Sequence, residues 1–141
     1  MTVSIEDAAR QFRMEVLRLA RRIGEDRAAD AIGIAQFEVL THLHDRGSTT
    51  PGELARLESV TPPAINRTVN ALEAAGLVRR VGDPDDGRRI IVEVTDDGHT
   101  LIEETRRQRN ARMRAEFARL SREDRAAFRR VTELMAEMLR R

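Results

Sequence analysis

The sequence contains no cysteine, which excludes disulfide bonds, thiolate metal ligands and cysteine-based redox sensing. It also contains no apolar run that approaches the ~20 residues a helix needs to span a bilayer. The N-terminal segment MTVSIEDAARQF is acidic and lacks the basic and apolar regions of a signal peptide. We therefore expect a cytoplasmic protein without membrane association.

Motifs of the common enzyme classes are missing too. The sequence has no serine nucleophile elbow, no phosphate-binding glycine loop and no pair of glutamates arranged at helical spacing with a histidine. His42 and His44 are two residues apart on a predicted helix, so their side chains point about 200° apart and cannot chelate one ion together. A site that combines His99 with one of them stays open as an alternative. We predict no enzyme activity, no metal and no cofactor.

Length and composition indicate one helix-rich domain. The chain has 141 residues, of which 40% are hydrophobic and 35% are charged. The net charge is only +1, but its distribution is uneven. Residues 1–55 carry seven arginines against nine acids, residues 56–105 six against ten, and residues 106–141 twelve against five. Because bulk charge does not mark a polyanion-binding face, individual arginines have to be considered.

Two short helices joined by a sharp turn are predicted in the segment TTPGELARLESVTPPAINRTVNALEAAG. Thr50 caps the first helix, and Glu53 completes a capping box three residues later. Thr61 caps the second helix, and Gly76 is suited to the left-handed conformation that ends it. Each cap is followed by proline, which is favoured at the first helical position. Caps about eleven residues apart are typical of a helix-turn-helix.

A β-hairpin follows at once. The β-branched runs LVRRV and IIVEV flank the turn-forming loop GDPDDGRR, a pattern that predicts two antiparallel strands. A helix-turn-helix with such a hairpin is a winged helix, so the fold class is mainly α with a small β-hairpin wing. This architecture points to DNA as the partner.

Amphipathic helices are predicted on both sides of this unit. Residues 4–24 place apolar side chains at helical spacing, and further helices are expected over residues 96–119 and after Ser121. Their apolar faces are broader than the small winged helix can cover, so we predict a homodimer. Residues 1–141 then form a single domain with two parts. The winged helix-turn-helix lobe comprises residues 34–98, and the helical dimerisation region comprises residues 1–30 and 100–141.

The chain resembles the MarR (multiple antibiotic resistance regulator) family of bacterial transcriptional regulators over almost its full length. The matching stretches are IAQFEVLTHL, TTPGELARLESVTPPAINRTVNALEAAGLVRRV and DPDDGRRIIVEVTDDGHTL. The last of these is the most specific, because an acidic-Gly-Arg tip followed by a β run, Thr and Gly is an unusual combination. The resemblance implies a triangular homodimer with a winged helix at each lower corner. It often also implies a small-molecule pocket between the dimer region and the DNA-binding lobe.

The second helix of the helix-turn-helix has an outer face suited to reading bases. Ile65, Val69 and Leu72 recur at helical spacing and should face the core. Arginine suits guanine, asparagine suits adenine, and alanine or proline can touch a thymine methyl group. A single exposed residue of these types is more often solvated surface. Their shared position on the second helix of a helix-turn-helix favours contacts with bases or their flanking phosphates, above all by Arg67 and Asn66. The outer face comprises Pro63, Ala64, Asn66, Arg67 and Asn70.

Arg88 lies at the predicted tip of the hairpin, where an arginine can enter a narrow minor groove. Asp86, two residues earlier, is placed to hold the guanidinium by a bidentate pair. The remaining candidates are phosphate contacts or surface charges at the hairpin and at the start of the two helices: Thr49, Thr50, Thr61, Arg79, Arg80 and Arg89.

These observations predict a homodimeric, sequence-specific DNA-binding regulator. We expect a repressor that binds a pseudo-palindromic operator and is released by a small aromatic or hydrophobic effector. The alternative is a winged-helix protein-interaction module in a larger assembly, without sequence-specific DNA binding. An effector pocket is expected where the first two helices meet the long helix, although ordinary core is the competing interpretation of its residues: Phe12, Arg13, Val16, Phe37, Leu40, His44 and Ile102.

Overall fold

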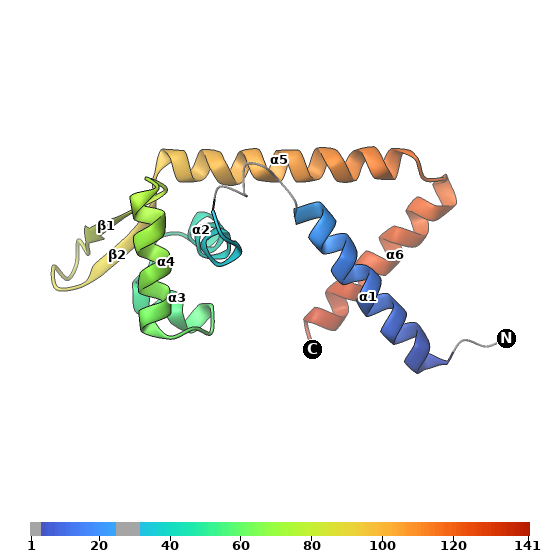
Figure 1. Cartoon of the computed structure of the whole chain (residues 1–141), viewed down its shortest axis with the longest axis horizontal. Helices are drawn as coiled ribbons and strands as arrows, with labels where there is room; N and C mark the ends of the chain where they lie inside the picture. The colour runs from blue at the N-terminus through green and yellow to red at the C-terminus, as the bar shows by residue number, and fades with distance from the viewer. Residues whose placement is uncertain (1–3, 25–31) are drawn as a thin grey trace.

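A long helix, α5 (Asp96–Ala118), joins two groups of elements. The computed structural model describes residues 4–24 and 32–141, so residues 1–3 and 25–30 of the predicted dimerisation region lie outside it. Figure 1 shows one group at the N-terminal end of α5 and two crossing helices near its other end. The first group comprises α2 (Ile34–Arg46), α3 (Pro51–Leu57), α4 (Pro62–Ala74), β1 (Val78–Gly82) and β2 (Ile90–Val94), and the second comprises α1 (Ile5–Gly24) and α6 (Arg122–Leu139).

The helices begin where the capping residues predicted them. The side chains of Thr50 and Thr61 accept hydrogen bonds from the backbone N–H of Glu53 and Ala64, at 3.2 and 3.3 Å. Gly76 has φ = 74°, the left-handed conformation expected at the end of the second helix. The helix-turn-helix is therefore confirmed, although the capping box is only half formed. The Glu53 carboxylate bonds Arg56 instead, because that guanidinium lies one turn ahead on the same face.

The predicted hairpin is also confirmed. β1 and β2 pair antiparallel, with Val78 opposite Val94 and Gly82 opposite Ile90. The segment before α3 adds to this sheet, since Thr49 and Val92 exchange two backbone hydrogen bonds of 3.2 and 2.8 Å. The start of the helix-turn-helix is thereby tied to the wing.

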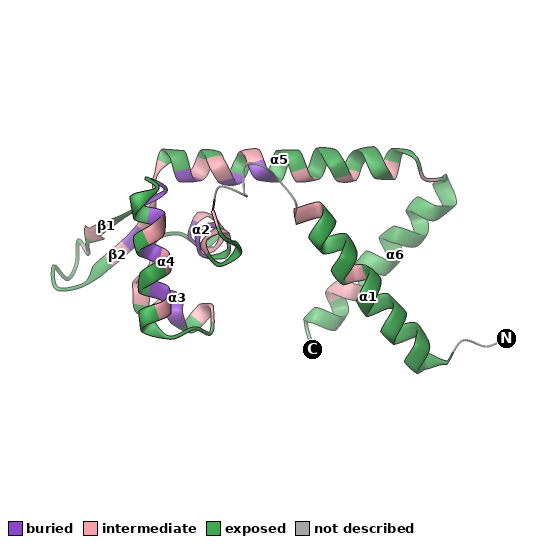
Figure 2. Ribbon diagram, viewed as in Figure 1, coloured by how far each residue is buried: buried purple, intermediate pink, exposed green. Residues whose placement is uncertain are grey.

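The hydrophobic core lies entirely in the group around α4 and the first turns of α5. Figure 2 shows the buried residues on these elements, and mainly exposed residues on α1 and α6. No described residue of α1 or α6 is buried in the single chain. The core comprises Val39, Leu40, Leu43, Leu54, Ala55, Ile65, Val69, Leu72, Leu77, Val78, Val92 and Ile102. The winged helix therefore forms a packed lobe, whereas α1 and α6 leave their apolar faces uncovered.

Among the described residues, no helix is both long enough and apolar enough to cross a membrane.

Candidate DNA interface

The recognition helix α4 has one buried and one exposed face, as its periodicity predicted. Ile65, Val69 and Leu72 have at most 1% of their surface exposed. The opposite face is open to solvent at Pro63, Asn66, Arg67 and Asn70, while Ala64 is half-buried. The residues predicted to read bases thus share one face of α4.

The turn between α3 and α4 sets the angle between these helices. Val60 donates its backbone N–H to the carbonyl of Ala55, and Ser59 has φ = 53°. A left-handed serine is uncommon and costs free energy, which sequence reasoning did not anticipate. Thr50 and Thr61 use their hydroxyl oxygens as caps, and Thr49 uses its backbone in the sheet.

The tip of the wing is organised by aspartate side chains that accept from backbone amides. Asp83 Oδ1 accepts from the N–H of Asp85 at 2.9 Å, and Asp86 Oδ1 accepts from the N–H of Arg88 at 3.1 Å. The expected pairing of the Asp86 carboxylate with the Arg88 guanidinium is therefore replaced by a backbone contact. The reason is local, because an aspartate favours hydrogen bonds to the amide two residues ahead in a turn.

Most arginines of the lobe are neutralised by a neighbouring carboxylate. The pairs are Arg56–Glu53 at 2.5 Å, Arg79–Glu93 at 3.3 Å, Arg80–Glu73 at 2.9 Å and Arg89–Asp83 at 3.8 Å. The hydrogen bond that Arg56 donates to Glu53 raises the pKa of Arg56, and the one that Arg79 donates to Glu93 raises the pKa of Arg79. These arginines thus have a carboxylate partner in the lobe, although Arg56, Arg79 and Arg89 stay largely exposed.

Arg67 and Arg88 differ from them. Neither side chain forms an ion pair or hydrogen bond with any residue that the structure describes, and both are exposed. One lies on the outer face of α4 and the other at the tip of the wing. The two arginines favoured by sequence reasoning are therefore uncompensated charges on the two elements that a winged helix presents to DNA.

The residues expected to line an effector pocket lie in two separate places. Phe12, Arg13 and Val16 line an open hollow of about 690 Å³ on α1, beside Met138 of α6. Leu40 and Ile102 are completely buried in the core of the lobe.

The other two members of that predicted pocket take part in contacts between α2 and α5. The guanidinium carbon of Arg109 lies 4.7 Å from the centre of the Phe37 ring. His44 Nδ1 lies 2.7 Å from His99 Nδ1. The predicted set is thus divided between a surface hollow, the core and the α2–α5 contact.

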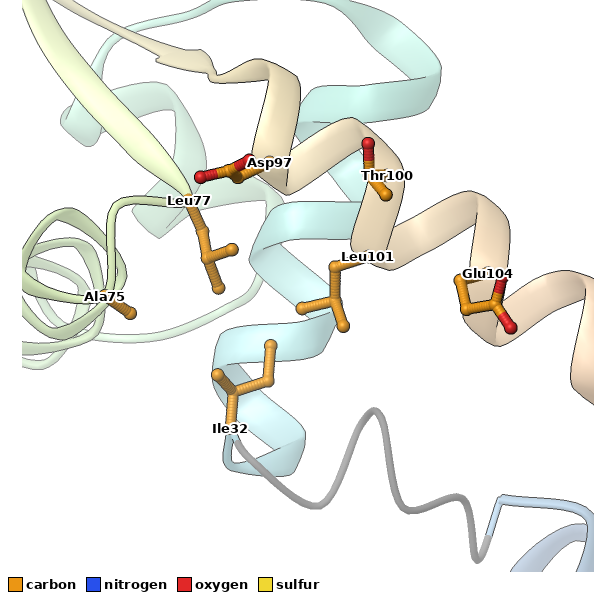
Figure 3. A pocket seen from close by; sticks show the side chains of 7 residues that line it. All are labelled: Ile32, Ala75, Leu77, Asp97, Thr100, Leu101 and Glu104. Carbon is orange, nitrogen blue, oxygen red and sulfur yellow. The ribbon is translucent and has the colours of Figure 1, made fainter.

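A different hollow lies beside the first turns of α5, with a volume of about 410 Å³. In Figure 3 the side chains of Ile32, Leu77 and Leu101 point toward a common space, and polar side chains follow one face of α5. Its lining residues are Ile32, Ala75, Leu77, Asp97, Thr100, Leu101 and Glu104.

A metal centre is not evident over residues 4–24 and 32–141, where no three His, Cys, Asp or Glu side chains are grouped to hold an ion. His42 and His44 face different neighbours, as their spacing predicted, because His42 Nδ1 lies 3.5 Å from Glu58 Oε1.

Comparison with known proteins agrees with this geometry. Residues 32–90 match the model of the MarR family. The chain is 32% identical to HTH-type transcriptional regulator Mb0904 of Mycobacterium bovis, over 93% of the chain and 92% of that protein.

Solved structures share the fold. The crystal structure of RV1404 from Mycobacterium tuberculosis has a TM-score of 0.88 and 24% identity, and the match covers 97% of this chain and 95% of that one. A mutant of Staphylococcus aureus MepR bound to an oligodeoxyribonucleotide has a TM-score of 0.72 and 21% identity, covering 94% and 97% of the two chains. The chain belongs to the MarR family of transcriptional regulators and has their DNA-binding winged-helix fold, not the fold of an enzyme.

Proposed function

We propose that the chain acts in the cytoplasm as a homodimeric repressor that binds a pseudo-palindromic operator with sequence specificity. The observation that carries this proposal is the placement of Arg67 and Arg88. They are exposed and uncompensated among the described residues, while four other arginines of the lobe are paired internally. In such a complex Arg67 contacts base edges in the major groove and Arg88 enters the adjacent minor groove.

Dimerisation is supported by the uncovered apolar faces of α1 and α6. A second copy would cover both faces and place two recognition helices on one side of the dimer. Two-fold symmetry then matches a pseudo-palindromic site with half-sites about 34 Å apart. The large apolar side chains left exposed on these helices are Ile5, Phe12, Met14, Leu17, Leu19, Phe128, Val131, Leu134, Met138 and Leu139.

Release by a small aromatic or hydrophobic effector is supported by the hollow beside α5. Its apolar part is formed by Leu77, which follows α4, and by Leu101 on α5. A ligand held there would touch both the recognition-helix end of the lobe and the long helix that leads to α6. A change in the angle between them alters the spacing of the two recognition helices, and a few ångströms are enough to weaken binding.

The rival function is a winged-helix module that binds another protein. In that case the open face of α4 and the tip of the wing would contact a protein surface. The local charge of the lobe is acidic, which keeps this alternative worth testing, whereas the partner in the MepR complex is an oligonucleotide.

The deciding experiment is selection of genomic DNA fragments by the full-length protein, followed by titration of the selected fragment and of random DNA at several salt concentrations. Sequence-specific regulation predicts tight binding to the selected site and a linear fall of log affinity with log salt. Equal affinity for both DNAs, or no enrichment of any fragment, would contradict the proposal and favour the protein-interaction module.

A further inference from the structure

His44 on α2 and His99 on α5 form a direct contact between their rings. The two Nδ1 atoms are 2.7 Å apart, and the ring centres lie 4.9 Å apart with the planes tilted by 58°. Both side chains are half-buried. Two ring nitrogens approach this closely only when a hydrogen lies between them, so one ring donates and the other accepts.

This contact belongs to a seam of polar interactions between α2 and α5. On one side of the histidines, Arg106 donates a hydrogen bond of 2.6 Å to Asp45. Farther along α5, Arg109 stacks on Phe37. Because α2 belongs to the packed lobe and α5 continues to α6, the seam helps to fix the lobe relative to the dimerisation region.

Some buried polar groups of α2 and α5 have no hydrogen-bond partner. Thr105 on α5 is completely buried, and its hydroxyl oxygen has no hydrogen-bond partner among the described residues; the same holds for the hydroxyl of Thr41 on α2. Unsatisfied buried hydroxyls lower the free energy gained by packing these faces together. The histidine hydrogen bond is therefore one of few polar contacts that hold α2 to α5.

The histidine contact depends on how many protons the pair carries. With both rings neutral, one Nδ1–H donates to the other Nδ1, and with one ring protonated the same bond persists. With both rings protonated, each Nδ1 carries a hydrogen and neither can accept. The bond is then lost, and two positive charges face each other across the seam.

The charges around the pair do not supply a second acceptor. Asp45 lies next to His44 on α2, but its carboxylate is bound to Arg106. Glu103 lies one turn after His99 on α5, but it is exposed and forms no hydrogen bond with either ring in the described part of the chain. His42 is turned toward Glu58 after α3. From β2 the charged residue is Glu93, which is paired with Arg79. From α4, the residues that reach the core beside α2 are apolar: Ile65, Val69 and Leu72.

We propose that the His44–His99 pair is a proton-operated latch between α2 and α5, closed while either ring is neutral and opened when both are protonated. Opening loosens the contact between α2 and α5, while the core contacts of α5 remain, and it weakens operator binding through this change. This consequence rests on the proposed DNA-binding function, whereas the latch itself does not. Histidine is the side chain whose protonation ordinarily changes between about pH 5 and 8, so acidification over that interval is the trigger.

The test compares full-length wild type with His44→Asn, His99→Asn and the double variant, from pH 8 to pH 5.5 at constant ionic strength. An asparagine amide places a donor and an acceptor near the position of Nδ1 and does not titrate. His42→Asn is the matched control, since it removes a histidine of α2 that faces Glu58 instead. Each series is run with and without EDTA, which shows whether a bound metal ion is responsible for any pH dependence.

Two readouts are followed: urea unfolding, and affinity for the selected DNA fragment. In wild type and His42→Asn, we expect the urea midpoint to fall as the pH falls, because the unfolded chain binds more protons than the latched one. Operator affinity should drop about tenfold over the same interval, which corresponds to the loss of one hydrogen bond. Both trends should be much weaker in the double variant.

Identical pH profiles of the wild type and the double variant would overturn the latch. It would also be overturned if EDTA alone abolished the pH dependence, since the pair would then be holding a metal ion. A failure of the proposed function gives a different result. Neither the wild type nor any variant then binds the DNA fragment specifically at pH 8, while the pH dependence of urea unfolding still shows whether the latch exists.

Discussion

Gly98, in the first turn of α5, packs directly against the carbonyl oxygen of Leu77. A β-carbon at position 98 would lie 2.2 Å from that oxygen and 2.6 Å from Cγ1 of Val94. Thr95 strengthens the same junction, since its hydroxyl donates a hydrogen bond of 2.6 Å to the carbonyl of Gly76. The long helix is thus seated on the turn that ends the recognition helix.

The first prediction follows from this contact. Gly98→Ala should destabilise the protein by about 1–3 kcal/mol, because the obstructing atom is backbone and cannot rotate away. Gly52→Ala is the control: no atom lies within 4 Å of a β-carbon there, and the position is helical. It should stabilise the protein by roughly 0.5–1 kcal/mol. Urea unfolding measures both, and equal stability of the two variants would contradict the close packing at Gly98.

The second prediction concerns the ion pair between Asp45 and Arg106. The hydrogen bond from Arg106 lowers the pKa of Asp45. A lowered carboxyl pKa contributes stability above the unfolded value of about 3.9, and this contribution is lost as the pH falls through the folded value. Arg106→Gln should therefore be less stable than wild type at pH 7, and the difference should shrink below about pH 4. A difference that stays constant from pH 7 to pH 3 would show that the pairing does not matter.

The third prediction tests the uncovered face of α6. Val131→Asp should convert a dimer into monomers, because a carboxylate would have to be buried without a partner in the proposed interface. Sedimentation should give twice the 16.0 kDa of one chain for wild type, and the mass of one chain for the variant. Arg129→Asp is the control. Arg129 lies two residues before Val131, so its side chain points about 200° away from that of Val131 around the helix, and the variant should stay dimeric. A monomeric wild type would contradict the proposed assembly.

Arg67→Ala gives the fourth prediction. The loss of a guanidinium from the outer face of α4 should cost roughly 1–3 kcal/mol and relax base preference at one or two operator positions. Arg56→Ala removes a charge that is already paired with Glu53, so it should have little effect. Competition with operators altered at single positions measures the preference. An equal loss of affinity for operator and random DNA would make Arg67 a phosphate contact.

Much of the fold could be predicted because its signals are local. Thr50, Thr61 and Thr95 each cap the helix that begins next to them, and Gly76 ends α4 through its own φ. The two faces of α4 follow from helical periodicity alone. These features need no knowledge of what lies far away in the sequence.

The remaining features depend on which distant residues meet. His44 and His99 are 55 residues apart, so the sequence leaves a pairing of His99 with His42 or His44 open, and no local pattern predicts which of them it contacts. The residues expected to line an effector pocket lie in separate places for the same reason, because periodicity marks Leu40 and Ile102 as inward-facing without distinguishing core from cavity. At the wing, the sequence predicts that Asp86 pairs with the Arg88 guanidinium. In the structure its carboxylate accepts a hydrogen bond from the backbone N–H of Arg88, which is closer along the chain.

The fifth prediction concerns the wing. Arg88→Ala should weaken operator binding by about 1 kcal/mol or more while leaving stability and dimerisation unchanged. The side chain is exposed and has no partner in the described part of the chain, so its removal creates no cavity and breaks no contact. The salt slope of binding should also decrease if the guanidinium displaces counterions from the groove.

Two further variants separate the charge of Arg88 from the shape of the wing. Asp86→Ala removes the acceptor for the Arg88 backbone N–H, so it should loosen the tip and reduce affinity less than Arg88→Ala. Arg79→Ala removes an arginine of the same hairpin that is paired with Glu93, and it should leave binding almost unchanged. Unchanged affinity and an unchanged salt slope for Arg88→Ala would mean that the wing is only a structural hairpin. DNA contacts would then have to come from α4 alone, and Arg67 would carry the specificity without a second arginine in the minor groove.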